Sequence, residues 1–276
     1  MKKFIICLYR AIVKTIASDG VEHAGYMSFM LIMSMFPFLV FFLSATSFFG
    51  ASEIGRSLIE IIIESSPDNV IGSLKIRFEE LKSTPPTSLL NLAIFGTIWT
   101  SSSFVEGMRT ILNRILEIKS PPPYFIRRFL SILQFIMLSA MLAIVMLIFV
   151  FIPVLIEKVR LHNIIQFTNM WSYWKHLYIF LCLFFWVISF YIFIPNSKIN
   201  INQTIPGAIF TTITWQISGF LLSKYIQYYH QLSLVYGSLG SIIVTLIFFY
   251  IINFLFIIGA AFNYHFSMYG KEHVAS

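Results

Sequence analysis

The sequence has little charge for its length. Asp, Glu, Lys and Arg make up only 11% of its 276 residues, whereas a soluble globular domain carries about 25%. Hydrophobic residues account for 58%, and the mean hydropathy is +0.81. So few charged side chains cannot cover a water-exposed surface, and Gly and Pro are too scarce for a disordered or fibrous chain. The composition therefore excludes these classes and indicates a protein that folds in a membrane.

The sequence also lacks the patterns that metal sites and hydrolytic sites require. Its two cysteines, Cys7 and Cys182, lie in separate segments, so they form neither a disulfide framework nor a metal cluster. No two of the six histidines have H-x-x-x-H or H-x-H spacing, and six of the twelve acidic residues fall in segment 50–87 without ligand spacing. Nucleotide-binding, zincin and serine-elbow motifs are missing. We therefore expect no catalytic residue, no metal and no cofactor, and we predict that the chain is not an enzyme.

Long apolar runs are what the sequence has instead, above all near its C-terminus. Between Ile199 and Phe266 the single charged residue is Lys224. Two runs in this region, about 205–223 and 237–262, can each cross a hydrocarbon core of about 30 Å at 1.5 Å per residue. The aromatic-rich segment between them is typical of a membrane–water interface. We predict a hairpin of two transmembrane helices here.

Four further apolar runs precede this hairpin. The predicted fold is therefore an all-α, polytopic membrane protein with six transmembrane helices in one membrane domain, 1–276. Pro37 lies inside the first run and predicts a kinked or broken helix. The six predicted spans are about 29–49, 88–105, 131–153, 177–194, 205–223 and 237–262.

Two segments outside the spans have helical patterns of their own. Segment 1–28 contains an amphipathic pattern over residues 2–18, with basic residues between apolar ones, as in a helix that lies on an anionic membrane surface. Segment 50–87 combines acidic and basic residues in a pattern that predicts two short helices.

The positions of the basic residues predict the orientation. Six spans place both termini on one side of the membrane, and the dense basic cluster in the short segment 106–128 favours the cytoplasmic side. Segment 50–87 then faces the periplasm. Because Lys and Arg lie between apolar runs, the net charge of +7 indicates membrane topology and not a nucleic-acid partner.

Four arginines in and beside this cluster are candidate contacts for lipid phosphate, namely Arg109, Arg114, Arg127 and Arg128. Arginine binds phosphate through two parallel hydrogen bonds, and basic residues near a membrane surface attract anionic headgroups. The competing interpretation is that these arginines only set the topology.

Uncharged polar residues inside the spans are candidate functional residues, because a polar group at bilayer depth costs free energy unless it faces a partner or a cavity. The competing interpretation is a hydrogen bond between helices, which is a stronger alternative for Ser and Thr than for Gln216 and Asn253. No Asp or Glu lies inside a predicted span, so proton coupling through a buried carboxylate is not expected.

Four stretches form an ordered set along the chain. The first is 23–29 with Ser34 and Pro37, and the second is Ser101 and Ser102 with Asn113. The third is Pro195 and Asn196 with Pro206 and Gly207, and the fourth is Tyr225, Tyr236, Gly237, Gly240 and Gly259 with Asn263. This set resembles the YihY/BrkB family of bacterial inner-membrane proteins, historically labelled ribonuclease BN.

The resemblance implies a six-span protein of the bacterial inner membrane. It also implies a transporter or flippase-like protein that handles lipid or other amphipathic envelope components. One alternative is a structural membrane protein that binds envelope proteins or a second copy of itself, and a ribonuclease is a distant third. The family has an acidic residue where this chain has Ala261, so a role that needs a carboxylate there is not expected.

The candidate cargo-contacting or helix-packing residues combine both lines of reasoning. Gly237 and Gly240 are three residues apart, which predicts a close approach of a neighbouring helix at the start of the last span. The full set is Ser34, Pro37, Ser101, Ser102, Asn113, Pro195, Asn196, Gly207, Gln216, Tyr225, Tyr236, Gly237, Gly240, Asn253, Gly259 and Asn263.

Overall fold

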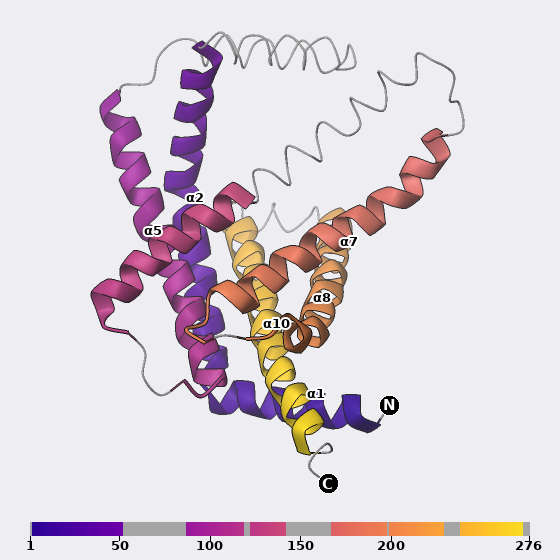
Figure 1. Ribbon diagram of the computed structural model, residues 1–276. Helices are drawn as coiled ribbons and strands as arrows, with labels where there is room; N and C mark the ends of the chain where they lie inside the picture. Colours follow the sequence, from indigo (N-terminus) through magenta and orange to yellow (C-terminus); the bar gives the residue numbers. More distant parts are fainter. Residues whose placement is uncertain are drawn as a thin grey trace.

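The computed structural model of the chain describes residues 2–51, 87–118, 122–141, 167–197, 199–228 and 238–272. Within these ranges the regular structure is helical, and no residue is in a strand. Six helices are labelled in Figure 1, and a further helix over Tyr124–Met141 carries no label. The predicted all-α fold is confirmed.

Three helices in the described ranges are long and apolar enough to cross a membrane: Tyr124–Met141, Ile201–Ile226 and Ile242–Tyr269. They overlap the third, fifth and sixth predicted spans. A shorter apolar helical stretch, Leu177–Phe193, lies at the fourth predicted span within α7 (Phe167–Phe193). The chain therefore has helices that can span a membrane, and the count of six spans stays a prediction.

The first two predicted spans lie in helices whose bounds differ from the prediction. A kinked or broken helix is predicted at Pro37; helix α2 (Gly20–Ala51) is continuous through it, so the helix is not broken there, and the kink stays a prediction. Helix α5 (Thr87–Ile115) continues ten residues past the predicted end of its span at 105. The continuation has apolar residues at helical spacing and no proline, so nothing in the sequence ends the helix earlier. It brings Glu106 and Arg109 into the bundle.

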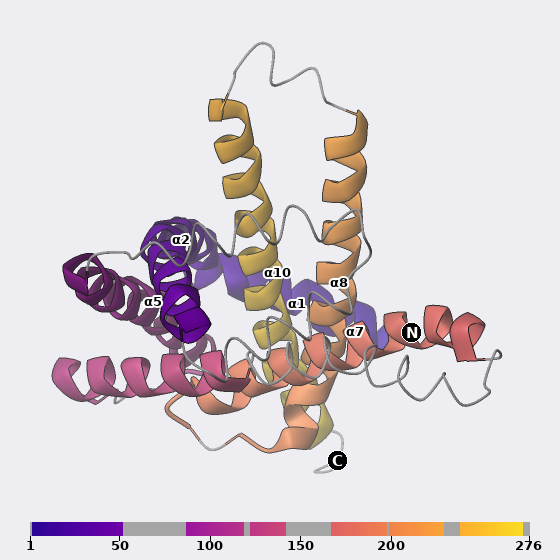
Figure 2. The same cartoon turned by 90° about the horizontal axis from the view of Figure 1, so that it is seen from above.

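The helices form two pairs. Helix α2 packs against α5, and α8 (Ile201–Tyr228) packs against α10 (Ser238–Glu272). The pairs meet through contacts of α10 with α2 and α5, and α7 packs on α8. Figures 1 and 2 show that the pairs converge near α1 and diverge away from it, and that both termini lie at the convergent end. We call this the terminal end of the bundle.

Helix α1 (Lys2–Ala17) lies across the terminal end and confirms the amphipathic helix predicted over 2–18. Its inner face has Cys7, Ala11 and Thr15 fully buried, four residues apart, and it contacts α10. Its outer face leaves apolar residues such as Ile5 and Tyr9 64% and 69% exposed. An exposed apolar helix face of this kind is typical of a helix that lies in a membrane interface.

Ionic contacts fix the C-terminal end of α1 to the end of α5. Lys14 pairs with Glu117, and Arg114 pairs with Asp19. Asp19 and Glu117 each have positive φ, 57° and 58°, in the connections that follow α1 and α5. A hydrogen bond from Lys14, and a second one from Tyr264, lower the pKa of Glu117 below its ordinary value.

Several predicted features lie outside the described residues. They are residues 52–86 of the predicted periplasmic segment, the end of the third predicted span after residue 141, Tyr236 and Gly237. Gly240 lies in the first turn of α10.

Candidate functional site

Two glycines of the candidate set bring α8 and α10 into close contact. A Cβ atom on Gly207 would collide with the Gly259 carbonyl oxygen and with the amide of Asn263. A Cβ atom on Gly259 would collide with the hydroxyls of Thr211 and Tyr191. Only glycine permits this approach, which is the packing mode that small residues give membrane helices.

Asn263 secures the same crossing with a hydrogen bond. The Gly207 backbone N–H donates to Asn263 Oδ1 at 2.6 Å, and both residues are buried. The residue before Gly207 is Pro206, which has no N–H and interrupts the hydrogen bonding of α8. Asn263 therefore accepts a bond from the backbone at the point where the helix is perturbed.

Tyr191 joins α7 to this crossing. Its hydroxyl donates to the Phe256 carbonyl oxygen at 2.7 Å and lies 2.7 Å from Thr211 Oγ1. The ring stacks on Phe256 with centroids 4.8 Å apart, and Tyr191 is only 2% exposed. A buried hydroxyl with two partners costs little to bury, so Tyr191 links three helices at one point.

Two further candidates meet beside α7. The Asn196 backbone N–H donates to Asn113 Oδ1 at 2.9 Å, which ties the connection after α7 to the end of α5. Pro195 is buried beside this bond. Asn113, Pro195, Asn196, Gly207, Gly259 and Asn263, predicted from three separate stretches, therefore gather at the terminal end of the bundle.

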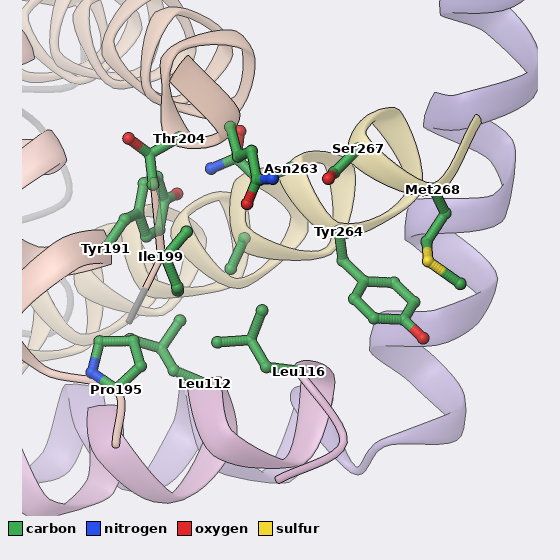
Figure 3. Close-up of a pocket in the computed structure, with 12 residues that line it drawn as sticks. Leu112, Leu116, Tyr191, Pro195, Ile199, Thr204, Asn263, Tyr264, Ser267 and Met268 are labelled. Carbon is green, nitrogen blue, oxygen red and sulfur yellow. The ribbon is translucent and has the colours of Figure 1, made fainter. Parts of the chain in front are cut away.

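A cavity of about 170 Å³ lies among these residues and is shown in Figure 3. Residues of α5, α7, α8 and α10 and of the segment after α7 surround it. None of its twelve lining residues is charged, and the polar ones include Gln203, Thr204, Asn263 and Ser267. We call it the terminal cavity.

Arg109 on α5 is completely buried, with 0% exposure. Its guanidinium donates to Glu106 Oε2 at 2.8 Å, to Ser131 Oγ at 2.7 Å, and to Gln134 Oε1. Two backbone carbonyl oxygens complete the set, that of Arg127 at 2.6 Å and that of Ile194 at 3.3 Å. We call Glu106, Arg109, Ser131 and Gln134 the Arg109 network.

This network joins α5, the Tyr124–Met141 helix and the end of α7. Ser131 also donates to Glu106 Oε2 at 2.8 Å, and Gln134 donates to the Phe193 carbonyl oxygen. A buried charge is tolerated only when it is paired and hydrogen-bonded. Because every nitrogen of the guanidinium has a protein acceptor, Arg109 holds helices together and directs its donors to protein groups.

A second cavity, of about 280 Å³, lies between α2, α5, the Tyr124–Met141 helix and α7. Eight of its eleven lining residues are apolar, and the other three are serines: Ser34, Ser101 and Ser139. Two of these serines belong to the candidate set. The Ser34 hydroxyl donates to the Leu31 carbonyl oxygen at 2.7 Å, so it adds little polarity. We call this cavity the four-helix groove.

The Arg109 network lies between the two cavities. Three elements contribute both to the groove and to the hydrogen bonds of Arg109: α5, the Tyr124–Met141 helix and the end of α7. On each of them the two residues concerned are four positions apart, a spacing that puts residues on one face of a helix. On α5 the next turn after Arg109 brings Leu112, which lines the terminal cavity. The three pairs are Val105 with Arg109, Phe135 with Ser131, and Phe190 with Ile194.

The other candidate arginines also have protein partners. Arg127 Nε lies 3.5 Å from Glu106 Oε1. Arg128 donates to Ser103 Oγ at 3.0 Å and to the Trp99 carbonyl oxygen at 2.9 Å, and it stacks on the Trp99 ring. Arg114 is more open, with a 42% exposed side chain paired to Asp19.

The remaining candidates are spread over the bundle. Asn253 donates to Ser28 Oγ at 3.2 Å and links α10 to α2, as expected for a hydrogen bond between helices. Ser102 is buried and donates to the Trp99 carbonyl oxygen at 3.0 Å. Gln216 and Tyr225 are half-buried on α8, away from both cavities.

Sequence reasoning missed Tyr191 and three members of the Arg109 network. From the sequence, Glu106 and Arg109 are expected in the short basic segment 106–128 between two spans, and neither Ser131 nor Gln134 stands out. A signal was present, because Glu106 and Arg109 are three residues apart and so are Ser131 and Gln134, and residues at this spacing share a helix face. Within the described residues, no group of three His, Cys, Asp or Glu side chains could hold a metal ion.

Comparison with known proteins gives matches over nearly the whole chain. The family described as virulence factor BrkB matches residues 11–274. The ribonuclease-like protein YfkH of Bacillus subtilis is 25% identical over 251 residues, which cover 89% of each chain. A UPF0761 membrane protein of Aliivibrio salmonicida is 24% identical, over 86% of this chain and 75% of its own. One from Vibrio campbellii is 23% identical, over 92% and 80%. No solved structure matches significantly.

Proposed function

This chain belongs to the virulence factor BrkB family, and we propose that it handles lipid or other amphipathic envelope components in the membrane without covalent chemistry. The observation that carries the proposal is the four-helix groove. Its walls are apolar apart from three serine hydroxyls, and it lies between helices whose outer surfaces are apolar. The best-fitting occupant is an acyl chain that enters from the bilayer.

The size and the lining of the groove support this occupant. Ligand pockets have volumes from about 300 Å³ upward, and the groove, at about 280 Å³, is close to this lower bound. It suits one segment of a hydrocarbon chain. Trp186 and Phe190 supply aromatic surface from α7, and Leu138 supplies aliphatic surface from the opposite wall. No charged side chain lines the groove, so a charged headgroup would stay outside it.

The Arg109 network bears on the path that a lipid could take from the groove toward the terminal end. It lies one helical turn from groove residues on α5 and on the Tyr124–Met141 helix, so a lipid that moved from the groove toward the terminal end would meet a fully paired guanidinium. Movement of a lipid past this point would need the network to open. Flippase-like handling therefore requires a rearrangement at Arg109, whereas simple lipid binding does not.

A second candidate function, a structural or partner-binding membrane protein, is favoured by a specific observation. The polar groups of Arg109, Asn253 and Asn263 all form hydrogen bonds between helices or their ends. Such bonds stabilise a scaffold and need no cargo. Partners in that case would be envelope proteins or a second copy of the chain.

Purified protein in liposomes with a fluorescent phospholipid separates the two functions. Ser139→Trp fills the groove, and Leu133→Trp places the same ring on the exposed opposite face of the same helix. We expect lipid redistribution by the parent protein and by Leu133→Trp, and a loss with Ser139→Trp. A photo-reactive acyl chain should label the groove in the parent. Absence of both redistribution and labelling would favour the structural function.

We further propose that the chain lies in the bacterial inner membrane with both termini in the cytoplasm. The relatives are bacterial, and two of them are named membrane proteins. In a variant without Cys7 and Cys182, single cysteines at Ser66 and Ser120 should react with an impermeant reagent from outside only and from inside only, respectively. The opposite labelling pattern would invert the topology.

A further inference from the structure

We propose that the surface around Arg128 binds the phosphate of an anionic phospholipid. Four side chains form this surface, which we call the Arg128 site: Tyr26 of α2, Trp99 of α5, and Tyr124 and Arg128 of the Tyr124–Met141 helix. The proposal requires that the chain lies in a membrane, and it does not rest on the function proposed for the four-helix groove.

The first argument is an excess of positive charge. Arg109 and Arg127 share one carboxylate, that of Glu106. Arg128 contacts Ser103, three residues before Glu106 on the same face of α5, and it forms no ion pair with any described residue. Three guanidiniums beside one carboxylate leave two positive charges in excess. Excess positive charge at a membrane surface attracts anionic headgroups.

The second argument is that Arg128 has donors to spare. A guanidinium carries five N–H groups, and the structure uses two of them, one to Ser103 Oγ at 3.0 Å and one to the Trp99 carbonyl oxygen at 2.9 Å. Arg128 Nε has no acceptor among the described residues, whereas all three nitrogens of Arg109 have one. Phosphate oxygens form strong, charge-assisted hydrogen bonds with such free N–H groups.

The third argument is the aromatic surroundings of this guanidinium. Arg128 Cζ lies 4.3 Å from the centroid of the Trp99 ring, which is 63% exposed. Burial raises the pKa of Tyr26, and the charge of Arg128 opposes this rise, as expected for a hydroxyl near the guanidinium. The hydroxyls of Tyr26 and Tyr124 are further donors for a phosphate oxygen. Trp and Tyr are also the residues that gather at the level of lipid headgroups.

The neighbouring side chains identify a lipid as the source of the phosphate. Phe125 and Phe129 are 84% and 67% exposed, which provides apolar surface for acyl chains. Arg128 lies near the start of the Tyr124–Met141 helix, which is long and apolar enough to cross a membrane. Basic residues at the end of a span lie at the level of the headgroups. A soluble phosphate ester would gain nothing from the exposed phenylalanines.

The Arg128 site and the four-helix groove lie on different faces of α5. Ser103 accepts a hydrogen bond from Arg128, and Ser101 lines the groove. These two serines are two residues apart, and residues at this spacing do not share a helix face. The headgroup position proposed here is therefore distinct from the groove.

The test uses the full chain in detergent and native mass spectrometry with three probes: dioleoyl phosphatidylglycerol, dioleoylglycerol and glycerophosphoglycerol. The first two have the same acyl chains and differ in the phosphate headgroup, and the third is the headgroup without acyl chains. We expect phosphatidylglycerol to bind at least about tenfold more tightly than dioleoylglycerol, as hydrogen bonds from a charged donor imply. Glycerophosphoglycerol should bind more weakly than the lipid.

Arg128→Gln is the decisive variant. It removes the charge and keeps a side chain that can donate to Ser103. The affinity for phosphatidylglycerol should fall at least about tenfold. Arg10→Gln is the matched control, because it removes the same charge from an exposed position of α1. A solvent-exposed charge is screened by salt, so this control should leave the affinity within about twofold of the parent.

Equal affinities for phosphatidylglycerol and dioleoylglycerol would overturn the proposal, as would equal effects of Arg128→Gln and Arg10→Gln. Binding of glycerophosphoglycerol as tight as that of the lipid would overturn the assignment to a phospholipid.

Two further variants complete the test. If Arg128→Gln elutes as aggregate, the double variant Tyr26→Phe with Tyr124→Phe removes two hydroxyls without changing the charge. It should lower the affinity for phosphatidylglycerol at least about threefold, and an unchanged affinity would overturn the proposal. Ser139→Trp, which fills the groove, should leave the preference for phosphatidylglycerol intact. Failure of this site and failure of the groove are therefore distinguishable.

Discussion

The two cavities of the bundle differ in how their walls are built. The terminal cavity lies beside the glycine-mediated crossing of α8 and α10, and some of its lining residues are polar and hydrogen-bonded. The four-helix groove is larger and mainly apolar, and its serine hydroxyls do little to change that character. The Arg109 network lies between them. The bundle thus has a cavity with some polar lining residues and a more strongly apolar groove, with the Arg109–Glu106 pair between them.

This difference indicates where the sequence can change and where it cannot. A groove that faces lipid tolerates exchange among apolar side chains, because volume and hydrophobicity are all that it requires. The terminal end depends on backbone contact, on exact donors and on paired charge. Substitutions there should cost more free energy of unfolding than equally large substitutions in the groove.

The largest effect is expected at the partition between the cavities. Arg109→Leu removes the nearer cation of Glu106 and leaves it Arg127, whose Nε lies 3.5 Å away; breaking a buried ion pair costs about 3–5 kcal/mol, and we expect a loss toward the lower end of this range. The double variant Arg109→Leu with Glu106→Leu should be more stable than Arg109→Leu alone, because the carboxylate is removed together with the guanidinium and Arg127, at 26% exposure, keeps access to solvent. Denaturation in detergent measures both. A double variant as unstable as the single one would show that the lost helix contacts matter more than the remaining carboxylate.

A smaller loss is expected at the glycine crossing. Gly259→Leu would force a side chain into the hydroxyls of Tyr191 and Thr211, and overpacking costs about 1–3 kcal/mol. Gly219→Leu on α8 is the matched control, since a Cβ there has no heavy atom within 4 Å. Thermal unfolding should separate the two variants clearly. If Gly219→Leu lowers the melting temperature as much as Gly259→Leu, the close crossing does not explain the effect.

Removal of one hydroxyl at the same crossing should have an intermediate effect. Tyr191→Phe leaves the Phe256 carbonyl oxygen and the Thr211 hydroxyl without their shared partner, and we expect a loss of about 1–2 kcal/mol. Tyr9→Phe is the control, because Tyr9 is 69% exposed on α1. Equal stability of Tyr191→Phe and the parent would mean that water or another group replaces the hydroxyl.

The sequence predicted the all-α fold and several residues at the terminal end, and the reason is local. Asn263 stands out because an amide within an apolar run is a functional candidate, whereas Gly207 and Gly259 are identified by the stretches that resemble the YihY/BrkB family. What they touch depends on helix order and on crossing angles, which leave no pattern in a single stretch. The cavity between them could not be predicted for this reason.

The Arg109 network shows the opposite case. Glu106 and Arg109 lie in the basic segment 106–128, and charge near the end of a span is usually a topology signal. Ser131 and Gln134 do not stand out in the sequence. Helix α5 extends far enough to bury Arg109, and the partners come from residues 22 and 25 positions later in the sequence. Pro37 is a similar case, because α2 continues through it and neighbouring groups in membrane helices can compensate for the missing N–H.

The smallest effect is expected at the surface contact that fixes α1 to α5, and it depends on pH. The folded state lowers the pKa of Glu117 below its ordinary value of 4.5, chiefly through the hydrogen bond from Lys14. A lowered pKa means that the pair contributes stability above about pH 4.5, and that this contribution is lost as the pH falls through the folded-state pKa. The Glu117 side chain is 56% exposed, so solvent screening limits the contribution to a fraction of a kcal/mol. Melting temperatures between pH 7 and pH 3.5 should fall slightly less in Glu117→Gln than in the parent, while Glu22→Gln, at an exposed position of α2, should follow the parent. Identical pH profiles for all three proteins would show that α1 is held by its buried face against α10 alone.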